Sequence, residues 1–497
     1  MISPVTLLSL QMFGLLWLGA SGSITTTTIA PPRTASTTTT TTTTPPTTST
    51  TPPTTIPPNS TTTSTPSPRD SKIWVLLVAG SMGFYNYRHQ ADICHAYQIV
   101  HANGIPDENI IVMMYDDIAN SDDNVYPGKI YNKPGGPDVY KGVPKDYTLN
   151  DVNPTNFINI LKGNKEALAG IGSGRVIESG PNDHIFVNFV DHGGPGVLYF
   201  PTNEELMADE LISNITQMAN NKQFEKLVLY VEACYSGSMF QNLLKDDLNV
   251  FVTTAADPYE SSYACYQDDS LGTYLGDVFS VNWMEDTEQE ILTKESLNHQ
   301  FEVVRAETKT SHVEEYGDLD LGLTKLSTVI GYKPMRMRKN GWSMKNEKSF
   351  IKFKDAVPSI DVPPTILKKK LDNTKEVFDR MELKMSLHVM KQKRLVVDKL
   401  ISSIISDVAV GNSSKITDIT DSKTDLNQET FYCYKTIYRE FSDKCLNVAK
   451  NIYVTTHLSK FVNFCNLPWT RLPVMLDAIN NHCSKGNFSR MGLKNVI

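Results

Sequence analysis

Short continuous apolar runs alternate with segments of helical periodicity between Lys72 and Asp257. The runs are KIWVLLVAGS, NIIVMMYDD, DHIFVNFVDHG, KLVLYVEACYSG and NVFVTTAAD, and each has the length and composition of a strand buried on both faces. Helical segments follow the first run and precede the third, with the sequences HQADICHAYQIVHANG and NPTNFINILKGNKEAL. This order predicts an α/β domain over residues 71–330 with a mostly parallel central sheet.

The hydrophobic pattern changes near residue 376. The segment EVFDRMELKMSLHVMKQKRLVVDKLISSIISDV has apolar residues at helical spacing, among them Leu400, Ile401, Ile404, Ile405 and Val408. We therefore predict a separate all-α domain over residues 376–497. Residues 331–375, between the two domains, contain 12 Lys or Arg against 4 Asp or Glu and include PSIDVPPT, which predicts an exposed basic linker.

The N-terminus has the features of a secreted protein. An apolar centre from Leu7 to Leu18 is followed by small residues, which predicts a signal peptide over residues 1–22. From Ser23 to Pro68, 39 of 46 residues are Ser, Thr or Pro, so residues 23–70 are expected to form an extended, O-glycosylated mucin-like segment of low complexity. No later run is apolar and long enough to span a membrane. We expect a secretory-pathway protein of the lysosome, endosome or extracellular space.

Charge and cysteine usage narrow the function. A net charge of −8 argues against a nucleic-acid partner, which requires a basic face. Four of the seven cysteines lie in the last 65 residues, at spacings of 12, 20 and 18 that match no zinc signature. On a secretory chain they favour two disulfides, and we expect no metal and no cofactor. N-x-S/T sequons make four asparagines candidates for glycosylation: Asn59, Asn214, Asn412 and Asn487.

Two of the predicted strands end on reactive side chains. DHIFVNFVDHG delivers His192 into a Gly-rich turn, and KLVLYVEACYSG delivers Cys234 into a turn of small residues. A lone Cys or His in such a place is more often structural, but both at strand ends predict a thiol nucleophile with an imidazole base. Since glycine lets backbone approach closely, the N–H groups of Gly193 and Cys234 are candidates for an oxyanion hole.

Longer motifs lie around these residues: NYRHQADICHAY, YDDIA, GVPKDYT, GIGSG, DHGGPG, EACYSGSM, ESSYACY and YLGDVFSVNWMED. On these motifs the chain resembles, from about Lys72 to its C-terminus, the legumain family of asparaginyl endopeptidases in the caspase-like clan. The resemblance implies a caspase-like catalytic domain with Cys234 as nucleophile, His192 as base and Asn86 orienting the imidazole. It also makes Asp191 a candidate for succinimide formation.

The same resemblance implies an S1 pocket built from Arg88, His89, Glu232, Ser262 and Asp277. An asparagine side chain offers one acceptor and two N–H donors, so a pocket with a guanidinium and carboxylates satisfies both ends. Cleavage after Asn is expected, and after Asp at low pH, with peptide ligation as a second use of the acyl-enzyme. Without the resemblance, Arg88 and Asp277 would be interpreted as a surface ion pair.

The C-terminal domain resembles the family's death-domain-like inhibitory prodomain, which implies the disulfides Cys433–Cys465 and Cys445–Cys483. The implied protein is a self-inhibited zymogen activated at acidic pH by cleavage in the linker. The family's KLxNTN stretch occurs here as KLDNTK, and the autocleavage candidates are Asn340, Asn346 and Asn373. Expected partners are protein and peptide substrates, the chain's own prodomain and cystatin-type inhibitors.

Two other functions compete with this interpretation. A GPI-anchor transamidase shares the His/Cys dyad, but it lacks a four-cysteine prodomain and usually ends in a membrane helix. A catalytically inactive, mucin-stalked binding protein would not need an intact dyad beside an intact pocket. Activity on an Ala-Ala-Asn fluorogenic peptide after acid incubation would discriminate among the three.

Overall fold

The computed structural model describes residues 71–334 and 353–483. The expected signal peptide and mucin-like segment lie outside the described residues, as do Asn59, Asn340, Asn346 and Asn487. In the part of the chain that is described, no helix is long and apolar enough to cross a membrane.

A six-stranded sheet forms the centre of the N-terminal region, in the order β11-β8-β7-β3-β1-β2. Five strands are parallel and coincide with the five apolar runs, so that prediction is confirmed. The antiparallel edge strand β11 was not predicted, because EEYG has no apolar run and is only half-buried. The strands are β1 (Ile73–Ala79), β2 (Ile110–Met114), β3 (His184–Val190), β7 (Lys226–Glu232), β8 (Val250–Thr254) and β11 (Glu314–Gly317).

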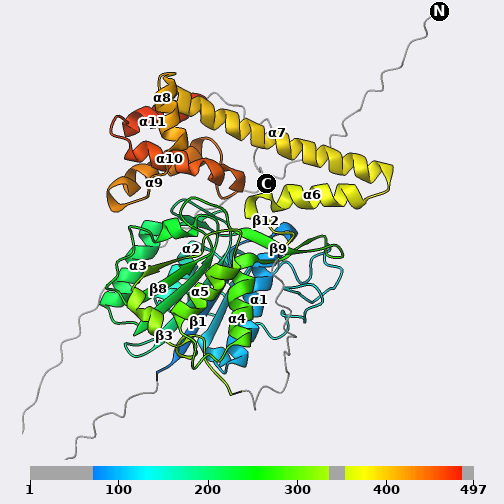
Figure 1. Ribbon diagram of the computed structural model, residues 1–497, viewed down its shortest axis with the longest axis vertical. Coiled ribbons are helices and arrows are strands. Elements are labelled where there is room, and N and C mark those ends of the chain that lie inside the picture. Colours follow the sequence, from blue (N-terminus) through cyan, green and yellow to red (C-terminus); the bar gives the residue numbers. More distant parts are fainter. Residues whose placement is uncertain (1–70, 335–352, 484–497) are drawn as a thin grey trace, which may run out of the picture. The chain divides into compact units, whose positions relative to one another are not determined.

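Helices cover both faces of this sheet (Figure 1). Successive side chains of a strand point to opposite faces, and in β1 Leu76 belongs to one apolar core while Val75 belongs to the other. The Val75 face packs against α1 (Tyr87–Ala102), α4 (Val278–Gln289) and α5 (Leu297–Glu307). The Leu76 face packs against α2 (Pro154–Leu161) and α3 (Ala208–Asn220). Burial on both faces explains why these strands are continuously apolar.

Shorter elements shape the edge of the sheet where the parallel strands end. One small sheet contains β4 (Gly193–Gly194), β5 (Val197–Tyr199) and β6 (Glu205–Met207), and another contains β9 (Tyr263–Asp268), β10 (Thr273–Asp277) and β12 (Val357–Pro358). The short 3-10 helices are η1 (Phe84–Asn86), η2 (Asp107–Asn109), η3 (Leu149–Asp151), η4 (Ser236–Met239), η5 (Leu319–Leu323), η6 (Leu326–Thr328), η8 (Ser359–Asp361) and η9 (Ile452–His457).

The expectation of an exposed linker is wrong for the end of residues 331–375. Strand β12 pairs with β9, and the next residues form helix α6 (Val362–Asn373). Two prolines occupy the first turn of α6, where a missing N–H leaves no bond unmade. Ile366 and Leu367 are buried, so this basic segment is anchored by apolar contacts that its overall charge conceals.

The remaining residues are all helical, as predicted. The helices are α7 (Val377–Val408), α8 (Ser413–Asp421), α9 (Gln428–Lys444), α10 (Leu458–Asn466) and α11 (Leu472–Cys483). Ile401, Ile404 and Ile405 of α7 are fully buried, which explains the helical spacing seen there. The structure contains the disulfides Cys433–Cys465 and Cys445–Cys483, the pairing that the resemblance implies.

Candidate active site

His192 and Cys234 lie at equivalent places on neighbouring strands. Strands β3 and β7 run parallel with Val190 opposite Glu232, and each reactive residue follows two positions later. Gly193 lies directly against this turn, because a Cβ there would be 2.4 Å from the carbonyl oxygen of Cys234. The site is therefore at the carboxyl edge of the sheet, where α/β proteins commonly bind ligands.

Asn86 fixes the orientation of the imidazole. Its Nδ2 donates to the carbonyl oxygen of Met82 at 2.9 Å, which turns its Oδ1 toward His192. Nε2 of His192 lies 2.9 Å from that Oδ1 and, in the neutral ring, must be the N–H that donates to it. The basic lone pair is then on Nδ1, which is buried and has no hydrogen-bond partner among the described residues.

Both reactive groups are uncharged in this state. Burial, reinforced by Arg88, lowers the pKa of His192 to about 3. Burial raises the pKa of the Cys234 thiol, although hydrogen bonding to Ser261, whose Oγ is 3.1 Å from Sγ, acts in the opposite direction. Burial thus favours the neutral forms of the thiol and the imidazole.

A buried ion pair lies beside them. Nε of Arg88 donates to Oδ1 of Asp277 at 2.8 Å, and the two side chains are 0% and 1% exposed. The guanidinium also donates to Oγ of Ser359 at 2.5 Å and to the carbonyl oxygen of Tyr85 at 3.2 Å. Arg88 and Asp277 therefore do not form a surface ion pair.

Two carboxylate oxygens in this pocket lack a hydrogen-bond partner among the described residues, although Oδ2 of Asp277 lies 3.7 Å from Nε2 of His89. Oε2 of Glu232 accepts from the backbone N–H and the hydroxyl of Ser280, at 3.0 and 3.1 Å. Oε1 of Glu232 and Oδ2 of Asp277 are buried without a hydrogen-bond partner among the described residues. Burial and the neighbouring Asp277 raise the pKa of Glu232 to about 8. A ligand with N–H donors would satisfy both oxygens.

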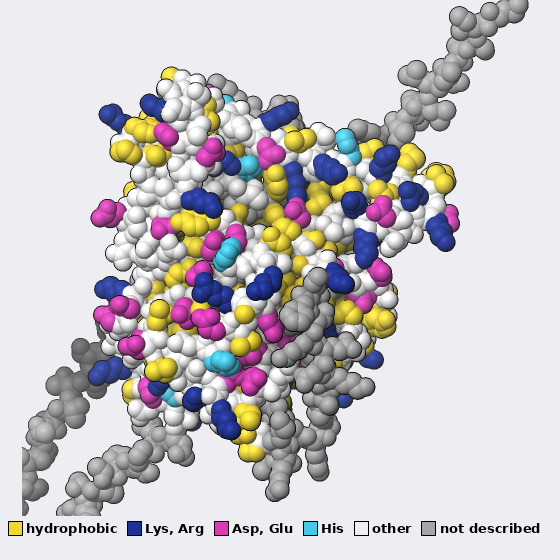
Figure 2. All heavy atoms as spheres, in the orientation of Figure 1, with side chains coloured by type: hydrophobic (Ala, Val, Ile, Leu, Met, Phe, Trp, Pro, Cys, Tyr) yellow, Lys and Arg dark blue, Asp and Glu magenta, His cyan; other side chains and the backbone are white. Residues whose placement is uncertain are grey.

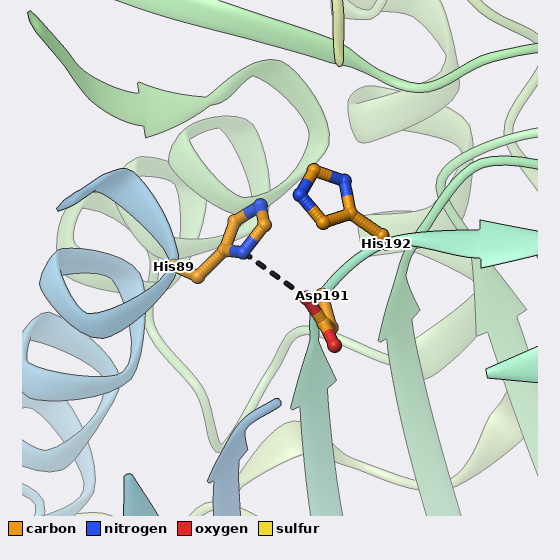
Figure 3. Close-up of side chains that lie close together, drawn as sticks. All are labelled: His89, Asp191 and His192. Atoms are coloured by element: carbon orange, nitrogen blue, oxygen red, sulfur yellow. Dashed lines mark ion pairs between the residues drawn. The ribbon is translucent and has the colours of Figure 1, made fainter. Parts of the chain in front are cut away.

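His89 and Asp191 connect the pocket to the imidazole (Figure 3). Nδ1 of His89 is 2.7 Å from the hydroxyl of Ser81 and 3.4 Å from Asp191, and its ring packs edge-on against His192. Burial, then the charge of Arg88, holds the pKa of His89 well below its usual value. In the described part of the chain, two groups bring potential metal-ligand atoms within 4.8 Å of one another: His89 with Asp191 and His192, and Asp257 with Glu260 and His312.

Sequence analysis missed Asp92 and Ser359 as parts of the pocket. Asp92 is fully buried, accepts from Nδ2 of Asn132 at 2.6 Å and accepts from the backbone N–H of Asp277 at 3.3 Å. Burial, then Asp277, raises its pKa well above the usual value. Its place one helical turn after Arg88 was a usable signal, since residues four apart share a helix face. Ser359 gave no signal, because it lies within residues 331–375, which were expected to be a linker.

The C-terminal helices cover the loop after His192. The hydroxyl of Tyr434 donates to the carbonyl oxygen of Pro195 at 2.5 Å, and a Cβ on Gly194 would lie 3.1 Å from Leu458. Asp425 accepts from Nδ2 of Asn242 at 3.1 Å and from the hydroxyl of Tyr259. Cys234 is only 5% exposed in this state.

Three further candidates lie in the described residues. Asn373 is the exposed last residue of α6. Asn412 is exposed and caps α8 by accepting from the N–H of Lys415 at 3.2 Å. Asn214 lies within α3 and donates to the carbonyl oxygen of Glu210 at 2.8 Å.

A thiol and an imidazole at the ends of adjacent parallel strands, beneath a helical cover, are typical of a cysteine peptidase made as a proform. The peptidase C13 family matches residues 73–332, and the legumain prodomain matches residues 385–483. Legumain of Bos taurus is 46% identical over 81% of this chain and 91% of its own, and legumain of Homo sapiens is 45% identical over 83% and 94%. The vacuolar-processing enzyme delta-isozyme of Arabidopsis thaliana is 39% identical over 83% and 90%.

The chain belongs to the peptidase C13 family and carries a legumain prodomain. It is therefore an enzyme, a cysteine endopeptidase, and the predicted fold class is confirmed: an α/β catalytic domain of the caspase-like type followed by an all-α region.

Proposed function

We propose that the chain is the zymogen of an endopeptidase that cleaves after asparagine, with Cys234 as nucleophile and His192 as general base. The observation that carries this proposal is the orientation of His192. Asn86 occupies Nε2 and leaves the buried Nδ1 as the basic atom, at the strand end next to Cys234. The legumain relatives, which match most of this chain, support the same assignment.

The pocket beside the dyad suits an asparagine side chain. The guanidinium of Arg88 would donate to the amide oxygen, replacing the bond that it makes to Ser359. The unpartnered oxygens of Glu232 and Asp277 would accept the two amide N–H bonds. A side chain without the amide leaves these buried groups unpaired, which strongly disfavours its binding.

The reaction follows from these positions. The sulfur of Cys234 attacks the carbonyl carbon while its proton moves to Nδ1 of His192, and the oxyanion is held by the N–H groups of Gly193 and Cys234. The leaving amine takes the proton from His192 as the C–N bond breaks, which leaves a thioester. Water then hydrolyses the thioester with His192 again as base, or an incoming amine captures it and forms a new peptide bond.

Cleavage after aspartate should require acid. The pocket is rich in carboxyl groups, and burial with Asp277 already holds the pKa of Glu232 at about 8, so a further negative charge is opposed. A protonated aspartic acid has nearly the shape of asparagine and carries no charge, so it can enter as the pH falls.

Latency would come from the helical region over the active site. Among the described residues, the ion pair Lys435–Asp209 at 2.7 Å joins it to the catalytic region, and the pair Lys369–Asp269 at 2.8 Å holds α6, which precedes the proposed cut after Asn373. Lys369 lowers the pKa of Asp269, so the stabilisation by that pair is present above the usual aspartate pKa and lost as pH falls through the lowered value. Each exposed ion pair of this kind contributes only about 0–1 kcal/mol to stability. The pairs therefore hold the proform closed only together with other contacts, among them the hydrogen bonds that Asp425 accepts from Asn242 and Tyr259.

Self-processing after Asn373, an exposed residue at the end of α6, would then separate the helical region. A secretory or lysosomal location and inhibition by cystatin-type proteins complete the proposal, since an acidic compartment supplies the activating pH.

Hydrolysis of an Ala-Ala-Asn fluorogenic peptide tests the function. We expect no activity from the proform at pH 7 and activity after incubation at about pH 4–5. Mass spectrometry should show a cut after Asn373, and the Cys234→Ala variant should show neither event. Transfer to an amine without detectable hydrolysis would favour a transamidase, and absence of both reactions would favour a binding protein.

A further inference from the structure

The first half of α7 presents an apolar row that is exposed in the described part of the chain. Phe378, Met381, Met385 and Val389 follow one another at spacings of three and four, so they share one face of the helix. They are 86%, 69%, 61% and 43% exposed. The row extends about 17 Å at 1.5 Å per residue. Such a contiguous exposed row on a helix marks an interaction surface rather than scattered surface residues.

This row is not the face with which α7 packs in the protein. Helix α6 lies along the first half of α7 (Figure 1). Leu383 and Leu387 are partly buried, and Leu383 lines a groove together with Ile366 of α6. The first half of the helix is thus apolar on two sides, and among the described residues only one of these sides packs against another element.

Basic residues outnumber acidic ones near the exposed row. Residues 368–394 contain nine Lys or Arg against four Asp or Glu, although the whole chain is acidic. Lys384 and Lys391 are exposed and lie on one side of the apolar row at helical spacing, and the exposed Glu382 borders its other side. Figure 2 shows dark-blue basic side chains among yellow apolar ones in the region of α6 and α7.

Charge decides among the occupants of this surface. A second copy of the chain that paired through the same row would bring an equally basic surface against it. Residues 335–352 carry six Lys or Arg against one Glu, so they would also meet like charge. An acidic protein would satisfy the charge, but a single convex helix face offers it no pocket of the kind that anchors protein interfaces.

We infer that the apolar row from Phe378 to Val389 docks the full-length chain on the surface of an anionic lipid bilayer. Apolar side chains enter the boundary between headgroups and acyl chains, and the flanking lysines bind the anionic headgroups, which is how interfacial amphipathic helices associate with membranes. The inference does not depend on the proposed peptidase function, because it uses none of the residues of the active site.

Vesicle co-sedimentation tests the inference. The full chain with Cys234→Ala is mixed at pH 7 with vesicles of phosphatidylcholine alone or with about 30 mol% phosphatidylserine, a content that gives a strongly negative surface. We expect sedimentation only with the phosphatidylserine vesicles. Replacing Phe378, Met381 and Met385 together by Ser should lower the partition coefficient at least about tenfold. The matched control, Leu323→Ser with Tyr432→Ser, removes equally exposed apolar side chains elsewhere and should change nothing.

Two further measurements keep the test decisive if the triple variant folds poorly. Lys384→Glu with Lys391→Glu should also lower the partition about tenfold or more, whereas Lys222→Glu with Lys309→Glu should not. A fluorescent label on Phe378→Cys should shift to the blue on anionic vesicles, since Cys94 and Cys265 are buried and do not compete for it. Absence of sedimentation overturns the inference. The inference is also overturned if the chain does not bind vesicles but forms a dimer, or binds heparin or an acidic protein.

Discussion

At the residue scale, the chemistry depends on which nitrogen of His192 is basic. A histidine near a cysteine can present either nitrogen, and the sequence does not distinguish them. In the structure, Nε2 donates a hydrogen bond to Oδ1 of Asn86, whose amide is held by the carbonyl oxygen of Met82. Nδ1 is therefore the basic nitrogen. We therefore propose that Asn86 is a positioning residue, which would affect the reaction without contacting the scissile bond.

Replacing Asn86 by Ala should lower kcat by about 10²-fold or more and leave KM nearly unchanged, because the imidazole loses its orientation while the pocket stays intact. The acid-processed variant is assayed on the Ala-Ala-Asn peptide beside Asn220→Ala, an exposed control. A normal kcat for Asn86→Ala would contradict the assigned tautomer.

The ion pair of Arg88 with Asp277 gives a second prediction at this scale. Asp277→Asn should lower the free energy of unfolding by about 3–5 kcal/mol, because it leaves a fully buried guanidinium without its counter-charge. Thermal or urea unfolding of the Cys234→Ala background measures it. The control is Asp246→Asn, which makes the same change at an exposed position. If the two variants were equally stable, Arg88 would not be a fully buried charge that depends on Asp277.

At the scale of elements, the helical region is held on the catalytic region mainly by apolar packing. Phe431 of α9 is buried, and a Cβ on Gly196 would lie 3.2 Å from its ring. Tyr432, the next residue, is 75% exposed. Phe431 therefore packs at the junction with the catalytic region, whereas its neighbour Tyr432 does not.

Phe431→Ala should cost about 3–5 kcal/mol of stability and give the proform measurable peptidase activity at pH 7, because a large buried side chain is lost at the junction. Tyr432→Ala should change neither property. Urea unfolding and the neutral-pH assay compare the two variants, and latency that survives in Phe431→Ala would show that packing at this junction does not hold the proform inactive.

The elements also show what sequence patterns reveal. The five parallel strands could be predicted because burial on both faces makes them continuously apolar, and His192 and Cys234 were found because they end two of them. Helix α6 could not be predicted in this way, because its charge and its prolines are typical of linkers, and few of its side chains, such as Ile366 and Leu367, are buried. Ser359 reaches the pocket through a contact with Arg88 over 271 residues of sequence, which no local pattern contains. Asp92 could have been found from its place one helical turn after Arg88.

At the scale of the whole molecule, the buried carboxyl groups make stability depend on pH. Burial, then Asp277, raises the pKa of Glu232 to about 8, and burial raises that of Asp191 well above its usual value. These groups bind more protons in the folded than in the unfolded state, so the free energy of unfolding falls as pH rises from about 4 toward 8.

The acid-processed enzyme should therefore melt at a higher temperature at pH 5 than at pH 7.5, as measured by differential scanning calorimetry. Glu232→Gln should reduce this difference, since it removes the group with the raised pKa without emptying the pocket. A melting temperature that rises between pH 5 and pH 7.5 would contradict the protonation states assigned to the pocket.

The identity of the nucleophile is tested most directly by covalent trapping. Cys94, Cys234 and Cys265 are the free cysteines of the described residues, and all are buried, so a chemical label must be directed by the pocket. The acid-processed enzyme is treated with a peptide electrophile that carries asparagine at P1, digested and mapped by mass spectrometry. We expect one adduct, on Cys234, that is absent from Cys234→Ala and forms much more slowly on His192→Ala. Because these two variants do not process themselves, they are first cut by the wild-type enzyme. An adduct on Cys94 or Cys265, or equal labelling by an electrophile with leucine at P1, would contradict the assignment of Cys234.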